Sequence, residues 1–162
     1  MTRHHLSVPV LALAALAWAG DAKHKNDRNR SMPLTHFGPL MELPGVQWFS
    51  LQAGPRASDL AQAPWVGRLT DLGARFANFD QTASAIVQLD LVISVDTAVA
   101  HLAGALGKPT WLLLPFAGEW RWMVHRSDSP WYPTLRLFRQ TQPGDWPELV
   151  HRVRDALVAN RF

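Results

Sequence analysis

The stretch that decides the fold is "LDLVISVDTAVAHLAGALGKPTWLLLP", residues 89–115. It begins with a mostly apolar, β-branched run over 89–95, which is typical of a strand that is covered on both faces. Residues 96–107 follow as a helix of small residues, and Gly107 stands where a left-handed residue ends such a helix. Residues 110–114 form a second apolar run. The stretch therefore predicts a strand, a helix and a second buried strand in direct succession.

Short apolar runs and helical patterns keep alternating on both sides of this unit. Five or six alternations favour an α/β domain with a mostly parallel sheet and helices on both faces. The irregular stretch 115–134 is too long for an ordinary connection, and loops of that length are commonly functional. The other expected elements are strands over 10–18, 46–52, 73–79 and 135–138, a helix over 33–43, a helix over 81–89 with Asp80 as its N-cap, and a last helix starting at Asp145.

The composition fits one globular domain. A chain of 162 residues with 48% hydrophobic and 18% charged residues is long enough for a sizeable core and too short for two ordinary domains. The absence of cysteine excludes disulfides, zinc–thiolate sites and a cysteine nucleophile. No charge-free apolar run reaches about 18 residues, so we expect no membrane span.

The formal net charge of +3 is concentrated in residues 23–30, which sum to +3 by themselves. Such a cluster is either a solvated loop or a local site for an anionic ligand such as phosphate. No second basic stripe accompanies it, so nucleic acid is not an expected partner. The charged residues of the cluster are Lys23, Lys25, Arg28 and Arg30 against Asp27.

Ligands of α/β sheets gather at the carboxyl ends of the strands, where Asp96 and Thr97 stand. The first-turn amides of the helix that Thr97 opens would attract an anion. His101 lies one turn further along the same helix face. The structural alternative is that Asp96 is an N-cap and His101 a hydrogen-bonded helix residue. The chain has no GxGxxG, GxxxxGK[ST] or HExxH motif, so ordinary dinucleotide, P-loop or zinc-protease chemistry is not indicated.

Aromatic residues gather in "EWRWMVHRSDSPWYP", residues 119–133. One interpretation is a platform on which a base or sugar stacks, with Trp120 and Trp122 as the candidates. The other is aromatic packing beneath a long loop, and we favour it because aromatic side chains dominate core burial in general. Trp131 and Tyr132 belong to the same cluster.

These motifs resemble a known family. "DTAVAHLAGALGKPTWLLLP" is similar to the Asp-Thr/Ser-x-x-x-His-x-Ala-x-Ala-x-Gly-x-Pro motif of heptosyltransferase-like GT-B glycosyltransferases. The chain resembles more closely the C-terminal glycosyltransferase-like domain of bacterial tetratricopeptide-repeat proteins, distant relatives of the O-GlcNAc transferases. Further matches, in order over nearly all of residues 17–160, are "WAGDAKHKNDRNRSMPL", "GVQWFSLQ", "WRWMVHRSDSPWYPTLRLFRQ" and "GDW".

The resemblance implies a single Rossmann-like domain, the C-terminal half of a GT-B fold, over residues 17–162. This half binds a nucleotide-sugar donor. Asp96 would contact sugar or ribose hydroxyls, Thr97 would bind phosphate, and His101 would support that site.

The loop after the first strand would hold the diphosphate from the other side. Arg30 and Ser31 take the places of a basic residue and a hydroxyl near the phosphates, and Gly20 would let the backbone approach the donor. The nucleotide-sugar would be a substrate, and we expect no metal and no other cofactor.

The implied function is the donor-binding half of a glycosyltransferase that moves a hexosyl or heptosyl group to an unknown acceptor. The acceptor-binding half and the repeats are absent from this chain and would act in cis or in trans. No catalytic residue is therefore assigned. The alternative is a non-catalytic nucleotide-binding or protein-interaction module with the same fold.

Residues 1–19 have two interpretations. A basic start, an apolar run and Ala17-Trp18-Ala19 before Gly20 form the pattern of a secretory signal peptide. Cutting there would delete the first strand of the sheet. We therefore favour a cytoplasmic protein in which the atypical segment 1–16 forms part of that strand.

Overall fold

The structure, a computed structural model, describes residues 12–160. Its centre is a six-stranded sheet with the order β3-β2-β1-β4-β5-β6, in which every pair of neighbouring strands is parallel. This is the strand order of a doubly wound, Rossmann-like fold. The strands are β1 (Ala12–Ala17), β2 (Val46–Ser50), β3 (Leu69–Asp71), β4 (Leu91–Val95), β5 (Thr110–Leu114) and β6 (Leu135–Arg139).

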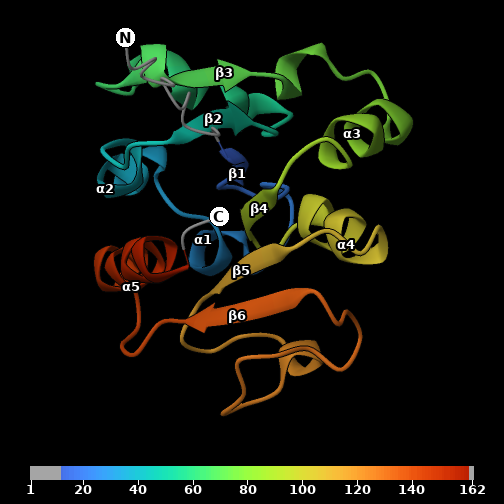
Figure 1. Ribbon diagram of the computed structural model, residues 1–162. Helices are drawn as coiled ribbons and strands as arrows, with labels where there is room; N and C mark the ends of the chain where they lie inside the picture. The colour runs from blue at the N-terminus through green and yellow to red at the C-terminus, as the bar shows by residue number, and fades with distance from the viewer. Residues whose placement is uncertain (1–11, 161–162) are drawn as a thin grey trace, which may run out of the picture.

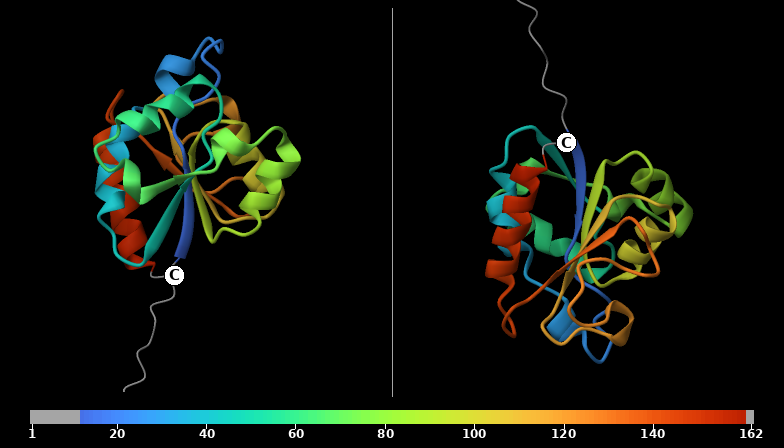
Figure 2. Two further views of the ribbon diagram at one scale, coloured as in Figure 1. Left: turned by 90° about the horizontal axis from the view of Figure 1, so that it is seen from above. Right: turned by 60° about the horizontal axis from the view of Figure 1, so that its bottom comes forward.

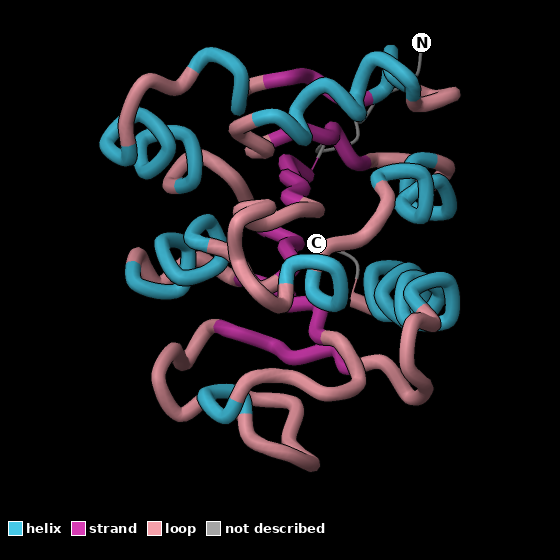
Figure 3. Tube along the Cα trace, turned by 180° about the vertical axis from the view of Figure 1, so that it is seen from behind, coloured by secondary structure: helices cyan, strands magenta, loops and turns pink. Residues whose placement is uncertain are grey.

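Helices cover both faces of the sheet, as the sequence predicts. In Figure 1, α2 and α5 lie on one side of the strands and α3 and α4 on the other, and Figures 2 and 3 show the same layers from other sides. Most of the helices are short. They are α1 (Asp27–Arg30), α2 (Gly38–Met41), α3 (Phe79–Ile86), α4 (Ala98–Ala105) and α5 (Trp146–Ala159), with 3-10 turns at Leu34–Phe37, Pro55–Gln62, Val66–Arg68, Gly73–Arg75 and Trp120–Trp122.

The period of two along the strands builds a core on each face of the sheet. Leu16 and Ile93 belong to the core beneath α2 and α5, whereas Ala15 and Val92 belong to the core beneath α3 and α4. All residues of β4 and β5 are buried, which explains why these strands read as continuous apolar runs.

The small residues of α4 let other segments come close. A Cβ atom on Gly104 would lie only 2.7 Å from Cγ of Tyr132, so the segment after β5 packs directly against this helix. The slim helix predicted from 96–107 is therefore confirmed, and Gly107 has the expected positive φ of 69°.

Three local predictions are wrong. The strand expected over 73–79 lies at Leu69–Asp71, and Gly73–Arg75 is a 3-10 turn. Asn78 caps α3 in place of Asp80, because its side chain accepts a hydrogen bond from the Gln81 amide. The helix expected over 33–43 is divided between a 3-10 turn and α2.

The first strand lies in the middle of the sheet, between β2 and β4. A cut after Ala19 would remove all of β1 and both of its pairings. The part of the signal-peptide hypothesis that concerns residues 1–11 lies outside the described residues. Within residues 12–160, no helix is long and apolar enough to cross a membrane.

Within residues 12–160, the strand order has its switch point between β1 and β4, and we refer to this place as the crevice. The chain leaves β1 toward β2 on one side and returns to β4 on the other, so the loops that follow β1 and β4 diverge at their carboxyl ends. Such a switch point is where doubly wound sheets bind ligands. Arg30, from the loop after β1, and Asp96, directly after β4, meet there.

Candidate functional site

Asp96 is the centre of the polar contacts at this crevice. Its side chain is almost fully buried, with the residue 5% exposed. The carboxylate accepts a hydrogen bond from the Trp122 indole nitrogen at 2.8 Å and lies 3.4 Å from Nε2 of His101. Its backbone carbonyl accepts from Nη1 of Arg30 at 3.2 Å. Three segments of the chain thus meet at one residue.

Burial by itself raises the pKa of the Asp96 carboxyl, but its partners outweigh burial. Hydrogen bonds from His101 and Trp122, together with the positive charges of His101 and Arg30, hold the pKa of Asp96 below its ordinary value. The carboxylate is therefore ionised at neutral pH and supplies a fixed negative charge beneath the crevice.

Arg30 reaches the crevice because Gly20 leaves room for it. A Cβ atom on Gly20 would lie 2.5 Å from Nη2 of Arg30, so the guanidinium packs directly on the glycine backbone. Nε of Arg30 is buried without a hydrogen-bond partner, and the nearest oxygen of Asp27 is 3.7 Å away. The family resemblance implies that Gly20 lets the backbone approach the donor. The structure shows that Gly20 also makes room for the Arg30 side chain.

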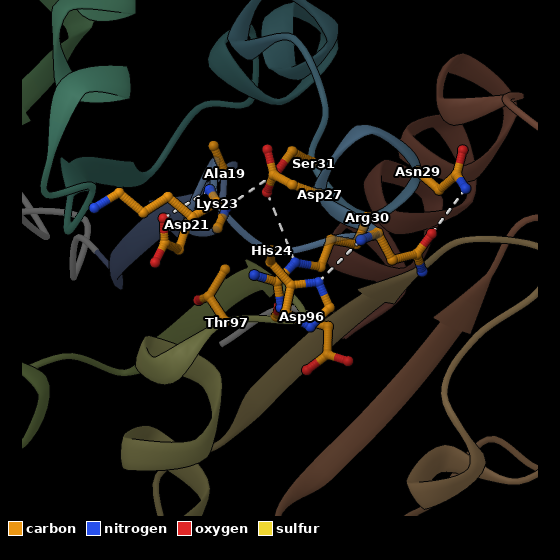
Figure 4. A network of polar contacts seen from close by, with 12 residues as sticks. Ala19, Asp21, Lys23, His24, Asp27, Asn29, Arg30, Ser31, Asp96 and Thr97 are labelled. Carbon is orange, nitrogen blue, oxygen red and sulfur yellow. Dashed lines mark hydrogen bonds and ion pairs between the residues drawn. The ribbon is translucent and has the colours of Figure 1, made fainter.

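Ser31 closes the same loop. Its hydroxyl accepts from the Gly20 amide at 2.9 Å and donates to Asp27 at 2.7 Å. Figure 4 shows residues of this loop beside Asp96 and Thr97, with Arg30 reaching toward Asp96. The structure thus brings Gly20, Arg30 and Ser31 together on one side of the crevice.

Thr97 is the N-cap residue of α4, and no side chain caps the helix. The first-turn amides therefore lack a side-chain acceptor, and the N-terminus carries the positive end of the helix dipole. The Thr97 hydroxyl lies 3.2 Å from that of Ser94. The interpretation of Asp96 as an N-cap is wrong, because Thr97 holds that position and the Asp96 carboxylate contacts Trp122 and His101.

His101 connects the crevice to the segment between β5 and β6. Its Nδ1 lies 3.1 Å from the Tyr132 hydroxyl, while its Nε2 faces Asp96. Both ring nitrogens therefore have partners within the chain. The role in phosphate binding stays a prediction, and the structure shows His101 as a bridge between Asp96 and Tyr132.

The two candidate stacking residues have different environments. Trp122 is 0% exposed, and its indole N–H donates to Asp96. This residue therefore packs beneath the segment, as the second interpretation expected. Trp120 is 75% exposed, and stacking by this residue stays a prediction.

Sequence reasoning missed two structural links at the site. Gln52, buried at the end of β2, accepts from the amides of Trp18 and Ala19 and donates to the Ala19 carbonyl. His24 lies 3.9 Å from Glu119, which joins the loop after β1 to the segment after β5. Neither link has a sequence signature, because both depend on which loops meet in space. In residues 12–160, no cluster of three or more His, Asp or Glu side chains is placed to hold a metal ion.

The parallel strand order defines a Rossmann-like α/β fold. Comparison with known proteins shows which proteins with this fold the chain is similar to. Residues 67–113 match the profile of glycosyltransferase family 9 (heptosyltransferase). The protein FlbA of Caulobacter vibrioides is 30% identical over 149 residues, which cover 88% of this chain and 24% of FlbA.

Two solved structures from E. coli share the fold. ADP-heptose LPS heptosyltransferase II superimposes with a TM-score of 0.69 at 18% identity, over 96% of this chain and 47% of that one. Heptosyltransferase WaaC with ADP-2-deoxy-2-fluoro heptose gives 0.63 at 16% identity, over 96% and 45%. The chain thus has the fold of one part of a heptosyltransferase and spans about half the length of these enzymes and a quarter of FlbA.

Proposed function

We propose that this chain is the donor-binding half of a glycosyltransferase and that residues 17–162 bind a nucleotide-sugar. The observation that carries the proposal is the crevice between β1 and β4, where Arg30 reaches the backbone of Asp96 beside the N-terminus of α4. A diphosphate would find there a guanidinium and the open amides of a helix. The match of residues 67–113 to a glycosyltransferase family supports a sugar as the rest of the ligand.

These groups suit the chemistry of glycosyl transfer. The nucleoside diphosphate gains negative charge as it leaves the sugar, and fixed donors and cations stabilise that charge. Arg30 and the first turn of α4 would do so, with the Thr97 hydroxyl as a further donor. A carboxylate has about four lone-pair positions. Asp96 therefore retains capacity for a sugar or ribose hydroxyl beside its bonds to His101 and Trp122.

The remainder of the enzyme would come from elsewhere. An acceptor-binding half, with or without tetratricopeptide repeats, would act in cis or in trans and would contribute the catalytic base. This chain alone would bind the nucleotide-sugar without turning it over. The transferred group would be a hexose or heptose. A cytoplasmic location belongs to the same proposal, since removing residues 1–19 would delete β1.

Calorimetric titration with ADP, UDP and GDP tests the proposal, with ADP first because a structural relative was solved with ADP. We expect Arg30→Ala to weaken binding by about tenfold or more, the effect of one lost charge-assisted hydrogen bond. Thr97→Ala should weaken it less. Arg154→Ala, which removes a charge from α5, is the matched control and should bind like the parent chain.

The alternative function has a distinct result in the same titration. A non-catalytic interaction module would bind none of the three nucleotides at millimolar concentration. Equal affinities of the parent chain and Arg30→Ala would likewise contradict the proposed site.

A further inference from the structure

A second hollow lies beside the crevice, between α4 and the segment that joins β5 to β6. It has a volume of about 410 Å³, within the range of about 300–1,000 Å³ that ligand pockets occupy. We propose that it binds the pyranose ring of a sugar. The lining residues are His101, Trp120, Arg121, Trp122, Trp131 and Tyr132.

Two indole rings of this hollow are open to solvent. Trp120 is 75% exposed and Trp131 is 56% exposed, although both side chains are among the largest apolar groups in the chain. Both indoles line the same hollow. Apolar surface gathered in this way marks a binding site more often than isolated exposed residues do.

The rings are held in place before any ligand arrives. The Trp131 indole nitrogen donates to the Arg121 carbonyl at 3.0 Å, and the Trp131 amide donates to the Ser129 hydroxyl at 3.2 Å. The Arg121 guanidinium lies 5.7 Å from the centre of the Trp120 ring and pairs with Glu119 at 2.5 Å. Side chains ordered in advance lose less conformational entropy on binding.

The lining of the hollow also includes polar groups. Arg121 is one of them, and the Tyr132 hydroxyl lies 3.1 Å from Nδ1 of His101. The His101 side chain is about one-third exposed. Flat apolar walls thus stand next to groups that exchange hydrogen bonds.

A pyranose matches this combination. Its C–H faces are attracted to the negative face of an indole, and its hydroxyls need partners around the ring edge. An aliphatic chain would cover the indoles but would desolvate Arg121 and His101 without replacing their hydrogen bonds. An inorganic anion would find Arg121 already paired with Glu119. Sugar is therefore the ligand chemistry that uses both kinds of surface.

The position of the hollow connects it to the proposed donor site. His101 lies one helical turn, about 5.4 Å, beyond Thr97. A ring in the hollow would belong either to the glycosyl group of the donor or to a sugar acceptor. The inference extends the proposed function, but it does not require that a nucleotide binds.

Indole N–H signals in a nitrogen-15 correlation spectrum provide the test. The chain has eight tryptophans, and Trp120→Phe and Trp131→Phe identify the two signals of interest. We expect both signals to shift with sugar, while the signal of buried Trp18, bonded to Asp59, stays in place. A shift with methyl hexopyranosides indicates an acceptor-type sugar. A shift with ADP-hexose but neither with ADP nor with the free glycosides indicates the donor's glycosyl group.

Affinity measurements complete the test. Trp120→Ala and Trp131→Ala should each weaken sugar binding by roughly 3- to 10-fold, the effect of one lost aromatic contact. Val124→Ala removes exposed apolar surface from the same segment outside the hollow and should bind sugar like the parent chain. The ADP affinity should be unchanged in all three variants.

The outcomes separate this proposal from the donor site. Sugar-dependent shifts of Trp120 and Trp131 without any ADP binding would support the hollow and overturn the donor site. Normal ADP binding with no shift for any sugar at millimolar concentration would overturn the hollow. Signals that move with protein concentration alone would identify a protein interface and would also overturn it.

Discussion

Two segments contact Asp96 and differ in chemistry. The loop after β1, residues 18–31, brings charge, and its Arg30 donates to the Asp96 carbonyl. The segment after β5, residues 115–134, brings aromatic rings, and its Trp122 donates to the Asp96 carboxylate. One buried residue thus bonds to both segments, through its backbone carbonyl to the basic loop and through its carboxylate to the aromatic segment. The site that we propose thus has separate places for an anionic group and for a ring.

The aromatic side contains a second contrast, between two residues of one type. Trp122 is fully buried and bonded to Asp96, whereas Trp120, two positions earlier, is mostly exposed. Trp122 therefore attaches residues 115–134 to the rest of the domain, whereas Trp120 lines the hollow and is exposed to solvent.

Trp122→Ala should lower the free energy of unfolding by about 3–5 kcal/mol, as expected for a truncated core tryptophan. The loss also leaves the Asp96 carboxylate without one hydrogen-bond partner. Trp120→Ala should change the same quantity by less than about 0.5 kcal/mol, because its ring is exposed. Urea denaturation of both variants measures the difference. A similar loss of unfolding free energy in the two variants would contradict the conclusion that Trp122 is structural and Trp120 is not.

Gly20→Ala should change stability by less than about 1 kcal/mol but should weaken nucleotide binding as much as Arg30→Ala. The new Cβ would displace the guanidinium, which is the flexible end of its side chain and can move without unfolding the loop. Denaturation and calorimetry on the same variant separate the two effects. Gly67→Ala is the control, because its Cβ would meet nothing within 4 Å. A Gly20→Ala chain with parental ADP affinity would show that Arg30 does not act at the site.

The smallest effect concerns acid stability. Because the folded-state pKa of Asp96 is lowered, its contribution to stability is present above the ordinary aspartate pKa of about 3.9 and is lost as the pH falls further. Asp96→Asn should remove this part of the pH dependence. Denaturation midpoints of both chains between about pH 2 and 6 report it. Two curves that remain parallel through this range would contradict the assignment.

The stability of the parent chain must be compared with that of Asp96→Asn at each acid pH, because other carboxyl groups also titrate in this range. The hydrogen bond from Arg126 lowers the pKa of Asp128, and that from Arg152 lowers the pKa of Glu148. Both groups are common to the parent chain and Asp96→Asn, so the difference between the curves isolates Asp96.

Much of the fold could be predicted from local patterns. The runs at 89–95 and 110–114 were readable because strands buried on both faces are continuously apolar. The strand at Leu69–Asp71 was misplaced because it has three residues and no apolar run of its own. Its position is determined by pairing with β2.

The candidate site was predicted in part. Asp96 and Thr97 were identifiable from their place after a buried strand, whereas Arg30 was singled out from the basic cluster only by the family resemblance. The partners of Asp96 were not, because Trp122 lies 26 positions away and Arg30 lies 66 positions away. No periodicity relates residues at such separations.

The sequence by itself determined the alternation of strands and helices, the parallel sheet and the position of the Asp96–Thr97 turn. These follow from hydrophobic period and local capping, which act over a few residues. The tertiary structure alone decided which tryptophan is buried, that Gly20 makes room for Arg30, and that an aromatic hollow opens beside the crevice. Those features depend on which loops meet at the carboxyl ends of the strands, and only the completed sheet brings those loops together.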